Sequence, residues 1–128
     1  MLDHIGFPVA DFQRSRDFYI AVLRPLGYGL VMEVGPDQGA DGWHAGFGKP
    51  GRPQFWINGG EPIQGRLHVA FMAQDQEQVD HFYAAALGAG AFDNGAPGLR
   101  PHYHPNYYGA FVIDPDGHNV EAVCHAPK

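Results

Sequence analysis

The fold is decided by the stretch Phe111-Val112-Ile113-Asp114-Pro115-Asp116-Gly117-His118-Asn119-Val120-Glu121-Ala122-Val123, in which two apolar runs flank Asp-Pro-Asp-Gly. Proline presets φ for the first central position of a tight turn, aspartate tolerates the second, and glycine closes the turn. The stretch therefore predicts a β-hairpin close to the C-terminus of the chain.

The strand after this turn carries a carboxylate among apolar neighbours. Alternation along a strand places Asn119, Glu121 and Val123 on one face, with Val120 and its alternate neighbours on the other. A buried carboxylate without a partner costs several kcal/mol or becomes protonated. We therefore expect Glu121 to have a partner, which could be a cation, a network of hydrogen-bond donors or a metal ion.

The composition indicates one globular domain spanning residues 1–128. Hydrophobic residues make up 45% of the chain and charged residues 17%, while 18 glycines and 11 prolines favour short strands and turns over a helical bundle. The formal net charge is -6, and the eight Lys and Arg residues are scattered along the chain, so we expect no nucleic-acid partner. Eight histidines raise the expectation of metal or proton chemistry.

The remaining features of composition concern the compartment. Cys124 is the one cysteine, and it cannot form a disulfide within the chain, which is typical of a reducing compartment. No apolar run approaches the ~18 residues of a membrane span, and Met1-Leu2-Asp3-His4 lacks the basic and apolar regions of a signal peptide. We therefore predict a cytoplasmic protein without a membrane partner.

A repeat of 64 positions runs through the chain. The matched pairs are His4 and His68, Phe7 and Phe71, Asp11 and Asp75, Phe18-Tyr19 and Phe82-Tyr83, and Leu23 and Leu87. Each half is predicted to form a strand, a helix with an aspartate N-cap, and three further strands. The repeat thus predicts two modules, at about residues 1–60 and 65–128.

Each predicted helix covers one face of its own sheet, so the opposite face carries His4 in the first module and His68 in the second. Two modules facing each other would bring both histidines into one cleft. A lone histidine is more often a hydrogen-bonded core residue. Two histidines at equivalent positions, together with Glu121, favour a shared site instead.

The repeated strand-helix-three-strand pattern, with His4 and His68 in equivalent strands and Glu121 after Asp-Pro-Asp-Gly, resembles the vicinal oxygen chelate superfamily. That superfamily comprises glyoxalase I, bleomycin and fosfomycin resistance proteins and extradiol dioxygenases. The resemblance implies an α+β fold, in which two tandem βαβββ modules form a cupped mixed sheet around a metal cleft. It also implies His4, His68 and Glu121 as the metal ligands.

The resemblance implies a homodimeric enzyme in which a small substrate chelates a divalent metal through vicinal oxygens. Fe(II) is the metal we favour for two imidazoles and a carboxylate, with Zn, Mn or Ni as alternatives. Gln54-Phe55-Trp56-Ile57-Asn58 has no carboxylate on or near Ile57, where glyoxalase I would have a second glutamate. This departure favours dioxygenase-like chemistry over lactoylglutathione-lyase-like chemistry. The alternative is a protein that binds a small molecule or antibiotic without catalysis, as bleomycin resistance proteins do.

The stretch Arg100-Pro101-His102-Tyr103-His104-Pro105-Asn106-Tyr107-Tyr108 precedes the seventh predicted strand. A loop beside a site often carries acids and bases, so His102, His104 and Tyr108 are the catalytic candidates. The alternative is a rigid loop whose aromatic side chains pack on the rim of the cleft.

Overall fold

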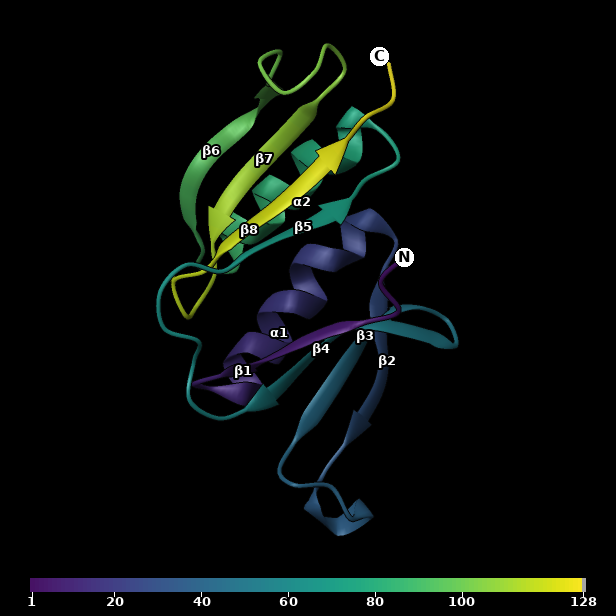
Figure 1. Ribbon diagram of the computed structural model, residues 1–128, viewed down its shortest axis with the longest axis vertical. Coiled ribbons are helices and arrows are strands. Elements are labelled where there is room, and N and C mark those ends of the chain that lie inside the picture. Colours follow the sequence, from purple (N-terminus) through teal and green to yellow (C-terminus); the bar gives the residue numbers. More distant parts are fainter. Residues whose placement is uncertain (128) are drawn as a thin grey trace.

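The computed structural model describes residues 1–127 and consists of two four-stranded sheets, each with its own helix (Figure 1). The first module contains β1 (Ile5–Val9), α1 (Phe12–Leu23), η1 (Arg24–Leu26), β2 (Gly29–Val34), η2 (Pro36–Gln38), β3 (His44–Lys49) and β4 (Arg52–Gly59). The second contains β5 (His68–Met72), α2 (Gln76–Gly88), β6 (Phe92–Leu99), β7 (Tyr108–Ile113) and β8 (Asn119–Cys124).

The two sheets have the same topology. Their strand orders are β1-β4-β3-β2 and β5-β8-β7-β6, with the first strand of each parallel to the last and the other pairs antiparallel. The predicted α+β fold of tandem βαβββ modules is therefore confirmed. The Asp-Pro-Asp-Gly stretch forms the turn between β7 and β8.

Both helices begin at the predicted aspartates. The Asp11 side chain accepts a hydrogen bond from the Arg14 backbone N–H at 3.1 Å, and the Asp75 side chain accepts one from the Gln78 N–H at 2.8 Å. Each bond satisfies a donor that the first turn of a helix leaves unpaired. Within residues 1–127, neither helix has the length and apolar character needed to cross a membrane.

One hydrophobic core joins the two modules. Its members come from both sheets and both helices, and they include the fully buried Tyr19, Phe47 and Phe82. The Tyr19 hydroxyl donates a 2.6 Å hydrogen bond to Asp114, so α1 is tied to the turn between β7 and β8. Figure 1 shows α1 at mid-height in the molecule, where it packs against α2.

Each sheet packs one face on this core and leaves the other open. On the open face of the second sheet, Glu121 pairs in register with Ala70 on one side and Phe111 on the other. In the first sheet Gly6 is the equivalent of Ala70, and it pairs with Trp56. Trp56 therefore occupies the position equivalent to Glu121, whereas Ile57 is buried in the core.

Candidate functional site

The carboxylate of Glu121 lies on the open face of the second sheet and is bonded to the imidazole of His68. His68 Nε2 lies 2.9 Å from Glu121 Oε1. Glu121 is 0% exposed, whereas half of the His68 side chain, 51%, is exposed to solvent. The buried carboxylate thus has a polar partner, as the strand pattern required, and that partner is one of the two predicted histidine ligands.

A second donor to Glu121 is Tyr107, which was not among the predicted site residues. Its hydroxyl donates a short hydrogen bond to Glu121 Oε2. Burial and then this hydrogen bond raise the pKa of the Tyr107 phenol well above its ordinary value, so the phenol stays protonated and remains a donor. Both oxygens of Glu121 are therefore occupied by side-chain donors.

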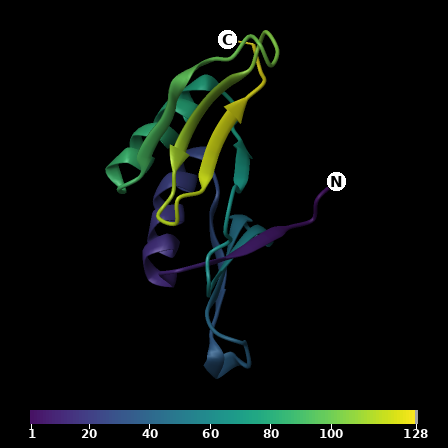
Figure 2. The same ribbon diagram turned by 60° about the vertical axis from the view of Figure 1, so that its left-hand side comes forward.

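The third predicted ligand, His4, belongs to the other sheet. It precedes β1, its side chain is 60% exposed, and its Nδ1 lies 2.6 Å from Asp3 Oδ1. Figure 2 shows the N-terminal end of β1 projecting from the side of the molecule. Within residues 1–127, no three His, Cys, Asp or Glu side chains come together in a way that could hold a metal ion. The expectation that two modules of one chain would bring both histidines into one cleft is therefore not met.

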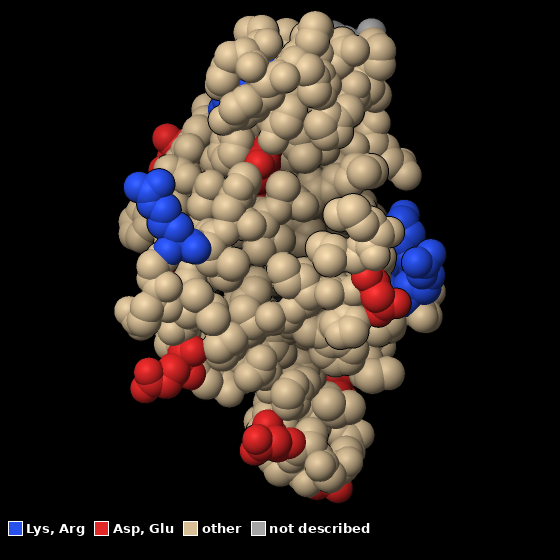
Figure 3. All heavy atoms as spheres, viewed as in Figure 1, with Lys and Arg blue, Asp and Glu red and all other residues tan. Residues whose placement is uncertain are grey.

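A crevice of about 200 Å³ lies between β1 and β5, at the boundary of the two modules. Its lining is mostly apolar and includes His4, Ala70 and Met72, but neither His68 nor Glu121. Above it, the open face of the second sheet shows one acidic patch over β7 and β8 within an uncharged surface, and most charged side chains lie at the edges (Figure 3).

The loop before β7 places its two histidines differently. His104 Nε2 lies 2.5 Å from His125 Nδ1, and both rings pack edge-on against Tyr107, with centroids 5.5 and 5.3 Å from it. His102 packs on Tyr103, with centroids 4.2 Å apart. His104 is therefore separated from Glu121 by one side chain, and His102 lies farther out in the loop.

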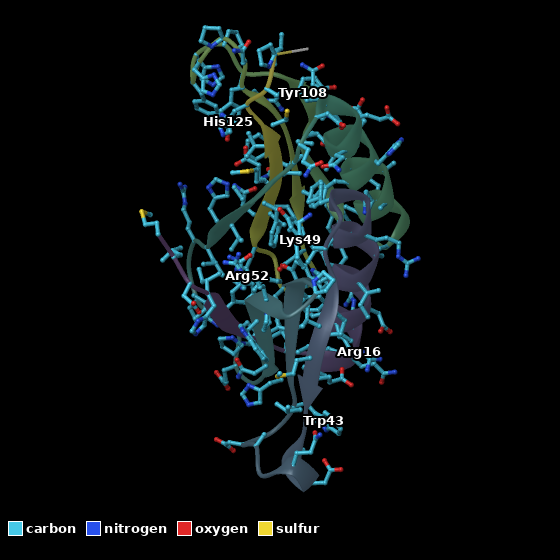
Figure 4. All side chains as sticks on the ribbon, turned by 90° about the vertical axis from the view of Figure 1, so that its right-hand side faces the viewer. Arg16, Trp43, Lys49, Arg52, Tyr108 and His125 are labelled. Atoms are coloured by element: carbon cyan, nitrogen blue, oxygen red, sulfur yellow. The ribbon has the colours of Figure 1, made fainter. Side chains whose placement is uncertain are left out.

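The third catalytic candidate, Tyr108, points the other way. Its hydroxyl donates a 2.6 Å hydrogen bond to Asp80 on α2, and Figure 4 shows it on the helix side of the sheet, opposite His125. Because alternate residues of a strand face opposite sides, only one of two adjacent tyrosines can reach Glu121. The structure gives that position to Tyr107, which shares its parity with Gly109 and Phe111.

The chemistry of these side chains fits a divalent metal. Two imidazole nitrogens and a carboxylate oxygen are the donor set of mononuclear Fe(II) sites with open coordination positions, and imidazole and carboxylate also suit Zn, Mn and Ni. Tyr107 on the outer oxygen of Glu121 resembles the hydrogen bonds that orient metal-binding carboxylates. Within one chain, two of these three donors meet.

Comparison with known proteins gives a family. The family model described as Glyoxalase/Bleomycin resistance protein/Dioxygenase superfamily matches residues 1–122. No match was found among the curated proteins.

Solved structures with the same fold include three informative relatives. A glyoxalase/bleomycin resistance protein from Albidiferax ferrireducens T118 is 28% identical, with 98% of each chain covered and a TM-score of 0.77. A glyoxalase/bleomycin resistance protein/dioxygenase family enzyme from Burkholderia phytofirmans PsJN is 20% identical over 98% of each chain, with a TM-score of 0.71. A mutant of the fosfomycin resistance protein FosX from Listeria monocytogenes, complexed with Mn(II) and 1S,2S-dihydroxypropylphosphonic acid, is 20% identical. The aligned region covers 96% of this chain and 88% of that one, with a TM-score of 0.68. The chain belongs to the glyoxalase/bleomycin resistance protein/dioxygenase superfamily.

Proposed function

We propose that this protein is a homodimeric, divalent-metal-dependent enzyme whose metal is bound by His68 and Glu121 of one subunit and His4 of the other. The observation that carries the proposal is the pair formed by a fully buried carboxylate and a half-exposed imidazole on the open face of the second sheet. His4 directly precedes β1 of the first sheet, and the repeat of 64 positions makes it the equivalent of His68. Within residues 1–127 one chain does not bring the three together, and in this proposal a second copy supplies the third.

Two-fold symmetry makes this arrangement self-consistent. In an isologous dimer, if the first sheet of one subunit covers the second sheet of its partner, the reverse contact exists as well. Both open faces are then covered, and each dimer has two equivalent sites. The exposed apolar side chains of these faces, such as Met72 and Met32, support this coverage because large exposed apolar surfaces mark interaction sites.

The metal would supply Lewis-acid or redox chemistry to a small substrate that chelates it through vicinal oxygens. The protein's own side chains orient the metal ligands and move protons. Tyr107 fixes one oxygen of Glu121 and leaves the other for His68 or the metal. His104, in contact with the Tyr107 ring, is the nearest candidate for moving a proton, with His102 at the rim. We favour Fe(II) and a dioxygenase-like reaction, with Zn, Mn or Ni and lyase or isomerase chemistry as the next choice.

One observation favours the alternative, a protein that binds a small molecule without catalysis. Both oxygens of Glu121 already have donors in the absence of a metal. A carboxylate satisfied in this way can be a stable part of a binding face. In that case His68 and Tyr107 would hold Glu121 for structure alone, and no metal would bind with useful affinity.

Mixed dimers separate these possibilities. Dimers of a His4→Ala chain with a Glu121→Gln chain contain one site with all three ligands and one site with neither variable ligand, whereas each parent homodimer has none intact. The experiment measures metal content after anaerobic titration with Fe(II), Mn(II), Ni(II) and Zn(II). We expect no tight binding in the parents and one metal per mixed dimer.

Three results would contradict the proposal. Metal binding by the Glu121→Gln homodimer as tight as wild type would remove Glu121 from the ligand set. Mixed dimers that bind no better than their parents would show that the three side chains do not meet across the interface. An absence of binding in the wild type would favour the non-catalytic alternative.

A further inference from the structure

A guanidinium lies on the same open face as the His68–Glu121 pair. Arg100 follows β6, and its Cζ lies 5.4 Å from the centroid of the Phe111 ring. Phe111 is the register partner of Glu121, and its ring centroid is 6.2 Å from that of His68. Arg100 is thus separated from the paired carboxylate and imidazole by one aromatic ring.

Two backbone carbonyls of β6 hold the guanidinium of Arg100 in place. Arg100 Nη1 donates to the Gly98 carbonyl at 2.9 Å, and Nη2 donates to the Ala96 carbonyl at 2.8 Å. A Cβ on Gly95 would lie 3.2 Å from Nη2 and 3.0 Å from the Phe111 ring, and one on Gly98 would lie 3.2 Å from Nη1. The two glycines therefore leave the space in which the guanidinium rests.

The charge of Arg100 has no ion-pair partner among residues 1–127. Within the described residues, no carboxylate lies within ion-pair distance of its guanidinium, and the side chain is half-buried. A guanidinium has five N–H donors, of which the two carbonyls take two. In a protein with a net charge of -6, such a cation is held in place although nothing in residues 1–127 pairs with it.

The backbone also links Arg100 to the site. The Arg100 N–H donates a 2.7 Å hydrogen bond to the Tyr107 carbonyl, and the Tyr107 hydroxyl donates to Glu121. The same face thus offers a metal-ligand pair at one end and a positive charge at the other.

We propose that Arg100 binds an oxyanion, a carboxylate or phosphonate, at the end of the substrate opposite the two oxygens that reach the metal. This inference rests on the proposed function and narrows its substrate to anionic compounds about one ring long that pack on Phe111. A planar guanidinium fork matches such oxyanions with two parallel hydrogen bonds, which a point charge does not.

The main test compares ligands that share vicinal oxygens and differ only in the anion. Catechol, protocatechuate and the phosphonate analogue of protocatechuate are titrated calorimetrically into Mn(II)-loaded protein. We expect the wild type to bind one or both anionic compounds about 10- to 100-fold more tightly than catechol, since hydrogen bonds to charged groups are the strong ones. The preferred compound distinguishes carboxylate from phosphonate.

The variant Arg100→Gln should lose this preference and bind catechol as the wild type does. Arg100→Lys keeps the positive charge and one carbonyl contact but cannot form two parallel hydrogen bonds to an oxyanion. It should therefore show an intermediate preference for the anionic ligands over catechol, and it replaces Arg100→Gln in the test if that variant unfolds. Arg14→Gln, on the exposed side of α1, is the matched control and should keep the full preference. An unchanged preference in folded Arg100→Gln and Arg100→Lys would overturn the inference.

A metal-free arm keeps this result separate from the proposed function. The Nε–H resonance of Arg100, assigned by its loss in Arg100→Gln, is followed in nitrogen-labelled protein during titration with benzoate and phenylphosphonate. A saturable shift supports the oxyanion site even if the wild type binds no metal, which would then refute only the metal-dependent function. No shift with either anion, together with equal affinity for the catechol compounds, overturns the oxyanion site.

Discussion

The contact between Glu121 and Tyr107 depends on the absence of a side chain at residue 109. A Cβ on Gly109 would lie 3.1 Å from Glu121 Oε2 and 3.2 Å from the Tyr107 ring, closer than most real Cβ contacts. Gly109→Ala should therefore push these two groups apart. We expect metal affinity to fall about 10- to 100-fold, the usual effect of disturbing the partners of a metal ligand.

Isothermal titration with Mn(II) would check this effect of Gly109→Ala. Gly29→Ala is the control, because a Cβ on Gly29, also in a strand, meets nothing within 4 Å. Equal affinities in the two variants would mean that the contact between Tyr107 and Glu121 does not influence the metal site.

Tyr108 carries a prediction about alkaline stability. Its hydrogen bond to Asp80, followed by burial, raises the pKa of the phenol from 10.0 to about 12. Because the folded pKa lies above the unfolded one, the stabilisation is complete below about pH 10 and is lost as the pH rises toward 12. The free energy of unfolding of Tyr108→Phe should therefore fall less than that of the wild type as the pH rises from about 10 to 12.

Urea unfolding of Tyr108→Phe and wild type at several pH values, from neutral to about 12, measures that difference. The exposed Tyr103, whose hydroxyl has no hydrogen-bond partner within residues 1–127, provides the control variant Tyr103→Phe. Parallel curves for wild type and Tyr108→Phe would show that the bond to Asp80 does not persist in solution.

At the level of elements, the β7–β8 turn is partly buried and is hydrogen-bonded to α1. Asp114 is only 4% exposed and accepts hydrogen bonds from the Tyr19 hydroxyl, the Asp116 N–H at 3.0 Å and the His118 N–H at 2.9 Å. If Asp114 acted only as a turn residue, its replacement would lower the free energy of unfolding by about 1 kcal/mol. Because Asp114→Ala leaves several buried donors without an acceptor, we expect a loss of about 2–4 kcal/mol.

Chemical denaturation compares Asp114→Ala with Asp37→Ala, which removes an exposed aspartate from η2. The second variant should unfold like the wild type. A similarly small effect in Asp114→Ala would mean that water replaces the lost acceptor, so that the link to α1 adds little stability.

At the level of the whole molecule, the two modules should not fold apart. Their buried side chains form one cluster, and separating the chain would expose α1 and the apolar side chains that it covers. We expect fragments 1–60 and 65–128 to be unfolded alone, because each would have about half of a core that is already small. Circular dichroism of each fragment, and of the mixture, tests this.

Recovery of native ellipticity only on mixing the fragments would support a single domain. A fragment that unfolds cooperatively by itself would instead establish independent modules.

Local pattern was sufficient for most of the architecture. The repeat of 64 positions, the two aspartate caps and the Asp-Pro-Asp-Gly turn are short-range features, and each appears where it was predicted. Strand parity also placed Glu121 correctly on the face opposite the helix. The same alternation could have identified Tyr107 instead of Tyr108. Phe111 is the register partner of Glu121, and Tyr107, four residues earlier, lies on the same face of the strand.

What the sequence determined by itself was therefore the order of elements, the face that carries Glu121 and the family. Tertiary structure decided which faces meet, because that depends on how two helices share one core. The helices α1 and α2 pack against each other and share one core. Within residues 1–127, His68 contacts Glu121, whereas His4 is exposed and contacts Asp3. Tertiary structure also decided the partners of Glu121 and the place of Arg100, since these contacts join side chains from different strands and loops that no local pattern relates.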